Sequence, residues 1–279
     1  MDILFNWECV YHIMDVLIFS GQSNMQGQSE ALTDTDPVEG ALEYRFLENS
    51  LIPLKNPVGE DITKDGTAGD TSNEDTDLSG WLRRHALGAA WCGCDNMVPA
   101  FCRAYIKECG RSVVAVHAAK GSTEIADWLP GTDCYRMLIR KTRAAMQKTA
   151  SVSMIENVFF IWLQGESDAI EGRSAERYKK SIRELAKALK NDINIDKYAV
   201  IRVGRFTEDA RDIAIMNSQN DVCRDDPQFL MLTEAAAEMC GNPRFMNPHV
   251  GGHFSAEGFA VIGDTAGKAL GQYVCESGK

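Results

Sequence analysis

A serine and a histidine that lie far apart in the sequence are the strongest candidates for chemistry. Ser23 follows an apolar segment in a run of glycines and uncharged polar residues, and His253 lies near the C-terminus. A serine hydroxyl is a weak nucleophile until a base removes its proton, and histidine is the usual base. Glycines beside Ser23 allow a tight turn that presents N–H groups to a substrate carbonyl. The pair therefore indicates acyl transfer, with a turn or cap serine as the alternative interpretation.

Two more groups of polar residues follow apolar segments. Residues 120–123 form one group, and residues 164–168 form the other, with Gln164, Glu166 and Asp168. Ligands of doubly wound sheets bind beyond the carboxyl ends of the strands, so we expect both groups to lie near the serine. Carboxylates in such loops more often cap helices or bind backbone N–H groups than form an acid–base pair.

The histidines and cysteines do not predict a metal site. His249 and His253 are four residues apart, but Gly251 and Gly252 lie between them and no third ligand is evident. The 9 cysteines are odd in number, lack a standard zinc spacing and follow no secretory signal. We therefore expect reduced thiols, a cytoplasmic location and no cofactor.

Apolar runs that alternate with helical segments predict an α/β fold. The expected strands, rich in β-branched and aromatic residues, are residues 15–20, 112–118, 157–164, 198–204 and 229–233. Near-continuous apolarity is typical of parallel strands that are covered on both faces. Helical spacing occurs over residues 99–108, 135–149, 175–190 and about 256–273, with Ser255 as the cap of the last helix. Alternating strands and helices predict a doubly wound sheet.

The length of 279 residues fits a single domain. We expect residues 14–279 to form it, residues 1–13 to be an N-terminal extension, and residues 59–80 to be an exposed loop. A net charge of −11 disfavours nucleic acid and anionic membrane surfaces as partners. No apolar run approaches the roughly 20 residues that cross a bilayer. The oligomeric state is left open.

Three sequence blocks carry a family resemblance. Residues 21–27, Gly-Gln-Ser-Asn-Met-Gln-Gly, resemble the first block of the SGNH/GDSL-type hydrolases in their carbohydrate acetylesterase branch, which includes acetylxylan esterases and sialate O-acetylesterases. Residues 162–168 resemble that branch's Trp-x-Gln-Gly-Glu-x-Asp block, and residues 119–128 are similar to its Gly-Gly-Thr/Ser…Trp segment. His253 stands where the family places its catalytic histidine. The resemblance covers residues 15–268 and implies a three-layer α/β/α sandwich with a flavodoxin-like, five-stranded parallel sheet.

The resemblance also implies a role for each site residue. Ser23 would be the nucleophile and His253 the general base. The N–H groups of Ser23 and Gly121 and the side-chain amide of Gln164 would bind the oxyanion. Trp128 follows Gly121 closely and could stack on a sugar ring, with a core or lid role as the alternative. The residues expected to bind the oxyanion or the substrate are Gln22, Asn24, Gly121, Gln164 and Trp128.

One position departs from the family pattern. The family usually has an Asp three residues before the histidine, and this chain has Val250 there. Residues 247–253 look like the family's Asn-Pro-Asp-x-x-His with one residue inserted and His249 in place of the Asp. Three explanations are open: a backbone carbonyl orients His253, Glu166 substitutes as the catalytic carboxylate, or activity is weakened or lost. We favour the carbonyl and place Glu166 second.

These observations predict a serine esterase without a cofactor, which removes O-acetyl groups from a carbohydrate through an acetyl-enzyme on Ser23. One alternative is a broad GDSL-type esterase or thioesterase that acts on small acyl esters. Another is a carbohydrate-binding relative that has lost its chemistry, which the missing Asp would explain.

Overall fold

The computed structural model describes residues 13–60 and 95–278. Of the predicted N-terminal extension, Ile13 belongs to the first strand, and residues 1–12 lie outside the described residues. The predicted loop over residues 59–80 lies outside them from residue 61 onward.

The described residues form one mostly parallel sheet with the strand order β3-β2-β4-β1-β5-β6-β7. Its strands are β1 (Ile13–Gly21), β2 (Ala41–Arg45), β3 (Ser50–Pro53), β4 (Ser112–Ala119), β5 (Met154–Leu163), β6 (Lys197–Ile201) and β7 (Phe229–Thr233). Only β2 and β3 pair antiparallel. All five predicted strands are confirmed, but the five-strand count is wrong because β2 and β3 extend one edge.

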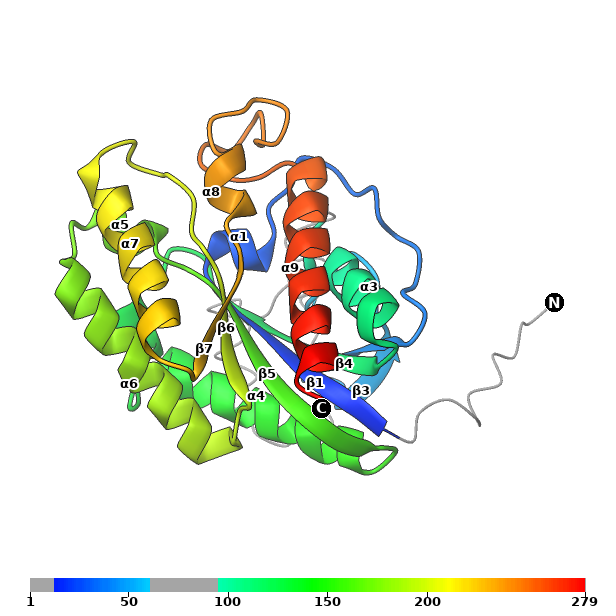
Figure 1. The fold of residues 1–279 in the computed structure, drawn as a ribbon. Helices are drawn as coiled ribbons and strands as arrows, with labels where there is room; N and C mark the ends of the chain where they lie inside the picture. Colours follow the sequence, from blue (N-terminus) through cyan, green and yellow to red (C-terminus); the bar gives the residue numbers. More distant parts are fainter. Residues whose placement is uncertain (1–12, 61–94, 279) are drawn as a thin grey trace.

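Helices cover both faces of the sheet, as Figure 1 shows. The helical elements are α1 (Ser23–Gln26), α3 (Val98–Cys109), η2 (Ile125–Trp128), α4 (Asp133–Ala150), α5 (Glu166–Ile170), α6 (Ala175–Ile193), α7 (Ala210–Asp225), α8 (Ala235–Met239) and α9 (Ala256–Glu276). One core cluster contains side chains of α4, α6 and α7, and the other contains side chains of α3, α8 and α9. The predicted three-layer α/β/α sandwich is therefore confirmed.

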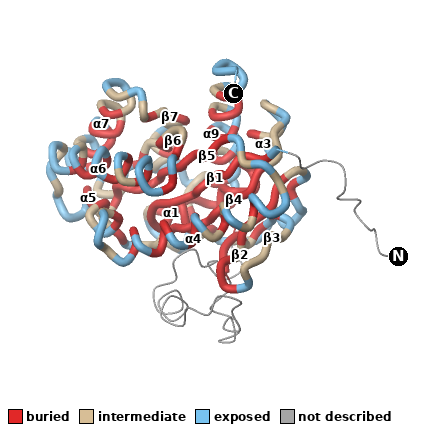
Figure 2. The backbone as a smooth tube through the Cα atoms, turned by 90° about the horizontal axis from the view of Figure 1, so that it is seen from below, coloured by how far each residue is buried: buried red, intermediate tan, exposed pale blue. Residues whose placement is uncertain are grey.

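Alternation along the strands builds these two cores. In β1, Val16 and Ile18 face one helical layer, while Leu17 and Phe19 face the other. The central strands are buried along nearly their whole length, which Figure 2 shows as a red tube through the middle of the molecule. Their continuous apolar sequence follows from this double cover.

Local signals at the helix ends act as the sequence predicts. The hydroxyl of Ser255 accepts a hydrogen bond from the N–H of Gly258 at the start of α9. Gly110 ends α3 in the left-handed conformation, with a φ of 71°. The four predicted helices are confirmed as α3, α4, α6 and α9. In the described part of the chain, no helix combines the length and apolar character needed to cross a membrane.

The central strands end together at one edge of the sheet. Gly21 is in register with Ala119 of β4 and with Leu163 of β5. Gly21 has a φ of 143°, and a Cβ there would lie 2.0 Å from the carbonyl oxygen of Leu163, so glycine is required. The next N–H, of Gln22, donates to that same oxygen at 3.1 Å. The polar groups that follow these three strands are therefore fixed side by side.

Candidate active site

The fold brings Ser23 and His253 into contact although they are 230 positions apart in the sequence. The Oγ of Ser23 lies 2.8 Å from the Nε2 of His253. Ser23 is the first residue of α1, directly after β1, and His253 lies in the loop before α9. Both residues are nearly buried. This distance suits proton transfer between a hydroxyl and an imidazole.

A backbone carbonyl orients the imidazole. The Nδ1 of His253 lies 2.8 Å from the carbonyl oxygen of Gly251, which can only accept, so the ring carries its proton on Nδ1. Nε2 is then free to accept the proton of Ser23. Burial lowers the pKa of His253 below 6.5, and the bond to Gly251 offsets this only in part. The imidazole is therefore neutral at pH 7, as a general base requires.

The side chain of Asn24 connects the histidine loop to α1. Its Nδ2 donates to the carbonyl oxygen of Gly252 at 3.1 Å and to Oε1 of Glu166 at 2.9 Å. Its Oδ1 accepts from the N–H of Phe254 at 3.4 Å. These partners occupy the amide of Asn24, for which the sequence predicts substrate binding, and two of them, Gly252 and Phe254, are the neighbours of His253 in the chain.

Among the described residues, Glu166 connects to the histidine loop through Asn24. Its Oε1 accepts from Asn24, and its Oε2 is buried without a hydrogen-bond partner among the described residues. Burial raises the pKa of Glu166, and the nearby charge of Asp168 adds to this. The carboxyl group does not take the place of the missing Asp on His253, because the Gly251 carbonyl occupies Nδ1. The explanation by a backbone carbonyl fits the geometry, and the one by Glu166 does not.

Gln164 is at the centre of a buried hydrogen-bond network. Its side chain is fully buried. Its Nε2 lies 2.6 Å from Oδ2 of Asp168, 3.0 Å from the carbonyl oxygen of Thr123 and 3.3 Å from Oε1 of Gln22. Two amide hydrogens thus face three acceptors, which leaves none for a substrate oxyanion. The hydrogen bonds of Gln164 therefore do not fit the oxyanion-binding role that was expected for it. The Oε1 of Gln22, another expected substrate contact, is an acceptor in the same network.

Asp168 has the structural role that was favoured for it. Its Oδ2 accepts hydrogen bonds from the N–H of Ile125, at 2.9 Å, and from the amide of Gln164. Burial raises its pKa to about 6, although both hydrogen bonds act in the opposite direction. Asp168 therefore connects the segment after β4 to the segment after β5.

Gly121 lies against the serine. A Cβ at Gly121 would be 3.5 Å from the Cβ of Ser23 and 3.3 Å from Oε1 of Gln26. The N–H of Gly121 donates to this Gln26 oxygen at 3.0 Å. The N–H of Gly121, which lies close to Ser23, is therefore already bonded to Oε1 of Gln26. A substrate oxygen that binds this N–H would have to displace the Gln26 oxygen.

Trp128 belongs to the core and does not form a sugar platform. It is fully buried, its indole N–H donates to Oγ1 of Thr123 at 3.0 Å, and its ring meets that of Trp162 edge to face at 5.7 Å. The predicted substrate contact of Trp128 is therefore wrong, because a ring without exposed surface cannot stack on a ligand.

Phe206 is a neighbour of the histidine that the sequence did not reveal. Its ring meets the imidazole of His253 edge to face, with 6.2 Å between centroids. It is partly exposed and comes from the loop after β6. A Cβ at Gly252, whose φ is 73°, would lie 2.0 Å from this ring, so glycine allows the close packing. Only the position after a strand end could have drawn attention to Phe206.

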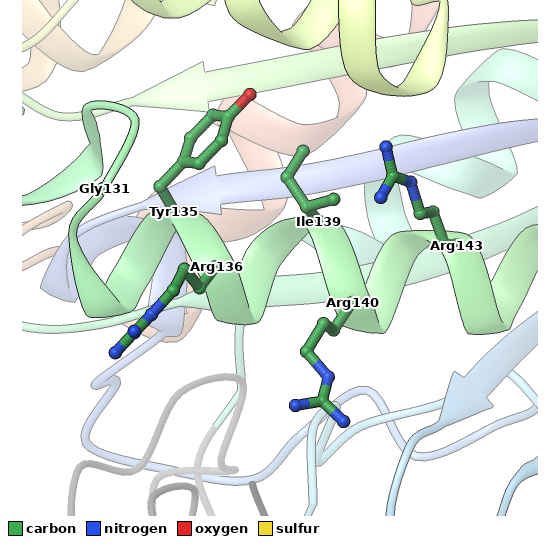
Figure 3. Close-up of a pocket in the computed structure, with 6 residues that line it drawn as sticks. All are labelled: Gly131, Tyr135, Arg136, Ile139, Arg140 and Arg143. Carbon is green, nitrogen blue, oxygen red and sulfur yellow. The ribbon is translucent and has the colours of Figure 1, made fainter.

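A separate hollow of about 310 Å³ lies along α4 (Figure 3). Its lining residues are Gly131, Tyr135, Arg136, Ile139, Arg140 and Arg143. None of them belongs to the predicted site, and Arg136 and Arg143 form ion pairs with Asp133 and Asp192. Within the described ranges, no group of three His, Cys, Asp or Glu side chains is placed to hold a metal ion.

The three-layer fold, with Ser23 and His253 together at the carboxyl edge of the sheet, is the arrangement implied by the resemblance to SGNH/GDSL-type hydrolases. Within this class, the chain belongs to the family described as carbohydrate esterase, sialic acid-specific acetylesterase, whose model matches residues 13–269.

Named relatives agree with this assignment. A probable carbohydrate esterase of Arabidopsis thaliana, At4g34215, is 27% identical over 116 residues, which are 39% of this chain and 43% of that protein's length. The solved structure of the Arabidopsis protein covers 95% of this chain and 98% of its own, with a TM-score of 0.60 and 19% identity. XAC1771 of Xanthomonas citri, described as a novel carbohydrate acetylesterase, matches with a TM-score of 0.55 and 12% identity over 95% of this chain and 57% of its own. At these identities the two structures support the fold.

Proposed function

We propose that this protein is a serine esterase that removes O-acetyl groups from a carbohydrate through an acetyl-enzyme on Ser23. The observation that carries the proposal is the 2.8 Å contact between the Oγ of Ser23 and the Nε2 of His253. Membership of the carbohydrate esterase family supports the substrate class. The assay described below distinguishes acetylated xylan, O-acetyl sialic acid and other acetylated sugars as substrates.

The first half of the reaction forms the acetyl-enzyme. Nε2 of His253 takes the proton of Ser23 while Oγ attacks the carbonyl carbon of the acetyl ester. The oxyanion that forms is bound by the N–H groups of Ser23 and Gly121, the latter after the oxygen of Gln26 gives way. The bond from the acetyl carbon to the sugar oxygen then breaks. His253 gives its proton to that oxygen, and the deacetylated sugar leaves.

The second half releases acetate. His253 takes a proton from a water molecule, whose oxygen attacks the carbonyl carbon of the acetyl group on Ser23. The tetrahedral intermediate collapses, the bond to Oγ breaks, and His253 returns the proton to Ser23. The carbonyl of Gly251 keeps the imidazole in the tautomer that both halves require.

Acetate release tests the proposal directly. Wild type, Ser23→Ala and His253→Ala would be assayed on acetylated xylooligosaccharides, O-acetyl sialic acid and p-nitrophenyl acetate. We expect kcat/KM to fall at least about a thousandfold in both variants, since each removes a partner of the proton transfer. Ser218→Ala is the matched control, because Ser218 is a buried serine of α7 outside the site, and it should keep the wild-type rate.

The outcomes separate the alternatives. Equal rates for wild type and Ser23→Ala would exclude the esterase mechanism. Hydrolysis of the aryl ester but of no sugar ester would favour a broad esterase of small acyl esters. A wild type that binds glycans but releases no acetate would favour the carbohydrate-binding relative.

A further inference from the structure

We propose that Asn24 and Glu166 act together as a positioning pair that holds the loop of His253 over Ser23, where the family usually uses an Asp. The inference rests on the proposed function for its kinetic consequences. Its structural claim concerns the environment of His253 and is tested separately.

Asn24 binds the peptide groups on both sides of His253. Its Nδ2 donates to the carbonyl oxygen of Gly252, and its Oδ1 accepts from the N–H of Phe254. The residue is almost fully buried and follows Ser23 directly in α1. One side chain therefore connects the segment that carries the nucleophile to the two peptide groups next to the base.

The histidine loop has further bonds of its own, but most of these join the loop to itself. The N–H of Asn247 donates to the carbonyl oxygen of His253 at 2.8 Å, and the N–H of His253 donates to that of Val250 at 3.3 Å. A second link to the first segment runs from Nδ2 of Asn247 to the carbonyl oxygen of Gln28. The contacts of Asn24 differ from these bonds because they join the peptide groups next to His253 to the residue that follows Ser23, so they hold the ring at its distance from the hydroxyl.

Glu166 orients the amide of Asn24. By accepting one N–H of Nδ2, its Oε1 directs the other N–H to Gly252 and the Oδ1 to Phe254. The second carboxyl oxygen is buried without a partner among the described residues, which makes the charged form costly. The role assigned to Glu166 requires only its acceptor oxygen Oε1 on Asn24 and no charge next to the imidazole, whose Nδ1 lies against the carbonyl oxygen of Gly251.

Asn24→Ala tests the pair, with Asn157→Ala as the matched control. Asn157 is an equally buried asparagine near the amino end of β5, away from the carboxyl edge that carries the site, and its side chain donates to Asp15. For Asn24→Ala we expect kcat to fall about 100-fold with KM within about threefold, because the base is misplaced while the substrate contacts remain. Both variants should lose thermal stability, because each removes a buried hydrogen-bonding side chain, but the control should keep the wild-type kcat and pH profile.

Two variants of Glu166 separate the acceptor role from a role of charge. Glu166→Gln retains an acceptor oxygen and Glu166→Ala does not, so we expect kcat to fall about tenfold further in Glu166→Ala than in Glu166→Gln. Equal losses in the two variants would show that the carboxylate charge is needed and would overturn the assignment. This pair of variants also carries the test if Asn24→Ala does not fold.

The protonation of His253 gives a readout that needs no activity. Its ring signal in an NMR titration would be identified by its absence in His253→Asn. Burial keeps the pKa of His253 low, so release of the loop in Asn24→Ala should admit water and raise it toward 6.5, while Asn157→Ala leaves it unchanged. An unchanged pKa and an unchanged kcat in Asn24→Ala would overturn the proposal. A wild type without Ser23-dependent acetate release would instead refute the proposed function, and the NMR result would still decide the positioning role.

Discussion

The imidazole of His253 lies beside a peptide carbonyl at the place where the resemblance to the family implies a carboxylate. The carbonyl of Gly251 fixes the tautomer, as an Asp would, but it carries no full charge to stabilise the imidazolium ion of the proposed reaction. Proton transfer thus depends more heavily on geometry, on the 2.8 Å contact with Ser23 and on the groups that hold the loop. A neutral carbonyl on Nδ1 raises the pKa of His253 less than a carboxylate would, so the effect of burial, which lowers this pKa, prevails.

The low pKa of His253 predicts the pH dependence of the reaction. Only the neutral imidazole accepts the serine proton, and burial shifts its pKa below 6.5. We expect kcat/KM to be constant above pH 7 and to fall on the acid side with a midpoint below pH 6.5. A pH–rate profile from pH 4 to 9 on p-nitrophenyl acetate measures the midpoint. A midpoint at or above 6.5 would contradict the effect of burial.

Residue types predict the proposed reacting pair more readily than its surroundings. Ser23 and His253 stand out in the sequence because few residue types can act as nucleophile and base, and both follow or precede predicted elements. Gln164 and Trp128 were given substrate roles, but their burial and their hydrogen-bond partners depend on the packing of distant segments. Phe206 was missed because an aromatic residue in a loop carries no chemical signal of its own.

At the scale of elements, the predictable strands are those whose burial leaves a continuous apolar sequence. β2 was missed because Glu43 and Arg45 interrupt its apolar sequence. In the fold the two side chains form an ion pair, with 3.3 Å between Nε of Arg45 and Oε1 of Glu43. α7 was missed for a related reason: it buries polar residues, among them Asp212 and Gln219. Gln219 accepts from the N–H of Val203 and donates to the carbonyl oxygen of Gln164, so tertiary contacts make its burial acceptable.

The contact between α3 and α9 gives a prediction at this scale. A Cβ at Gly267 of α9 would lie 2.1 Å from the carbonyl oxygen of Phe101 in α3. Gly→Ala in an exposed helix stabilises by about 1 kcal/mol, but here the two helices would have to separate. We expect Gly267→Ala to lower the free energy of unfolding by about 1–3 kcal/mol.

Urea unfolding of Gly267→Ala measures this change, with Lys268→Ala as the control on the exposed side of the same helix. The control should remain within about 0.5 kcal/mol of wild type. A gain in stability for Gly267→Ala would mean that the close approach of the two helices is not required.

At the scale of the whole molecule, strand order assembles the site. β1 lies between β4 and β5, so the segments after these three strands meet at one edge, and α9 places its preceding loop over the same edge. The same compact packing buries several carboxyl groups, including Asp15, Glu43, Glu166 and Asp168. Their protonation therefore affects the free energy of unfolding of the entire fold, and not only the properties of the site.

These buried acids predict that stability falls as pH rises. Burial raises the pKa of Glu43 to about 7 and that of Asp168 to about 6, from ordinary values near 4.5 and 3.8. The folded state thus holds these protons more tightly than the unfolded chain, so the stabilisation is present below the ordinary values and is lost as pH rises through the raised ones. Each group contributes on the order of 3 kcal/mol. The lowered pKa of His253 acts in the opposite direction, but only up to about pH 6.5.

Urea unfolding at pH 5 and pH 8 tests this expectation, with the lower free energy of unfolding expected at pH 8. Glu43→Gln provides the matched comparison, since an amide keeps an oxygen for the N–H of Gly59 and places its nitrogen where Oε2 has no partner among the described residues. Without this titrating group, the decline between pH 5 and 8 should become shallower by roughly half. The half-buried Glu124 and the exposed Glu257 have lowered pKa values, so they titrate below this range and leave the comparison unaffected. Stability that rises from pH 5 to pH 8 would show that the buried acids are charged in the folded protein, and that their hydrogen bonds outweigh the cost of burial.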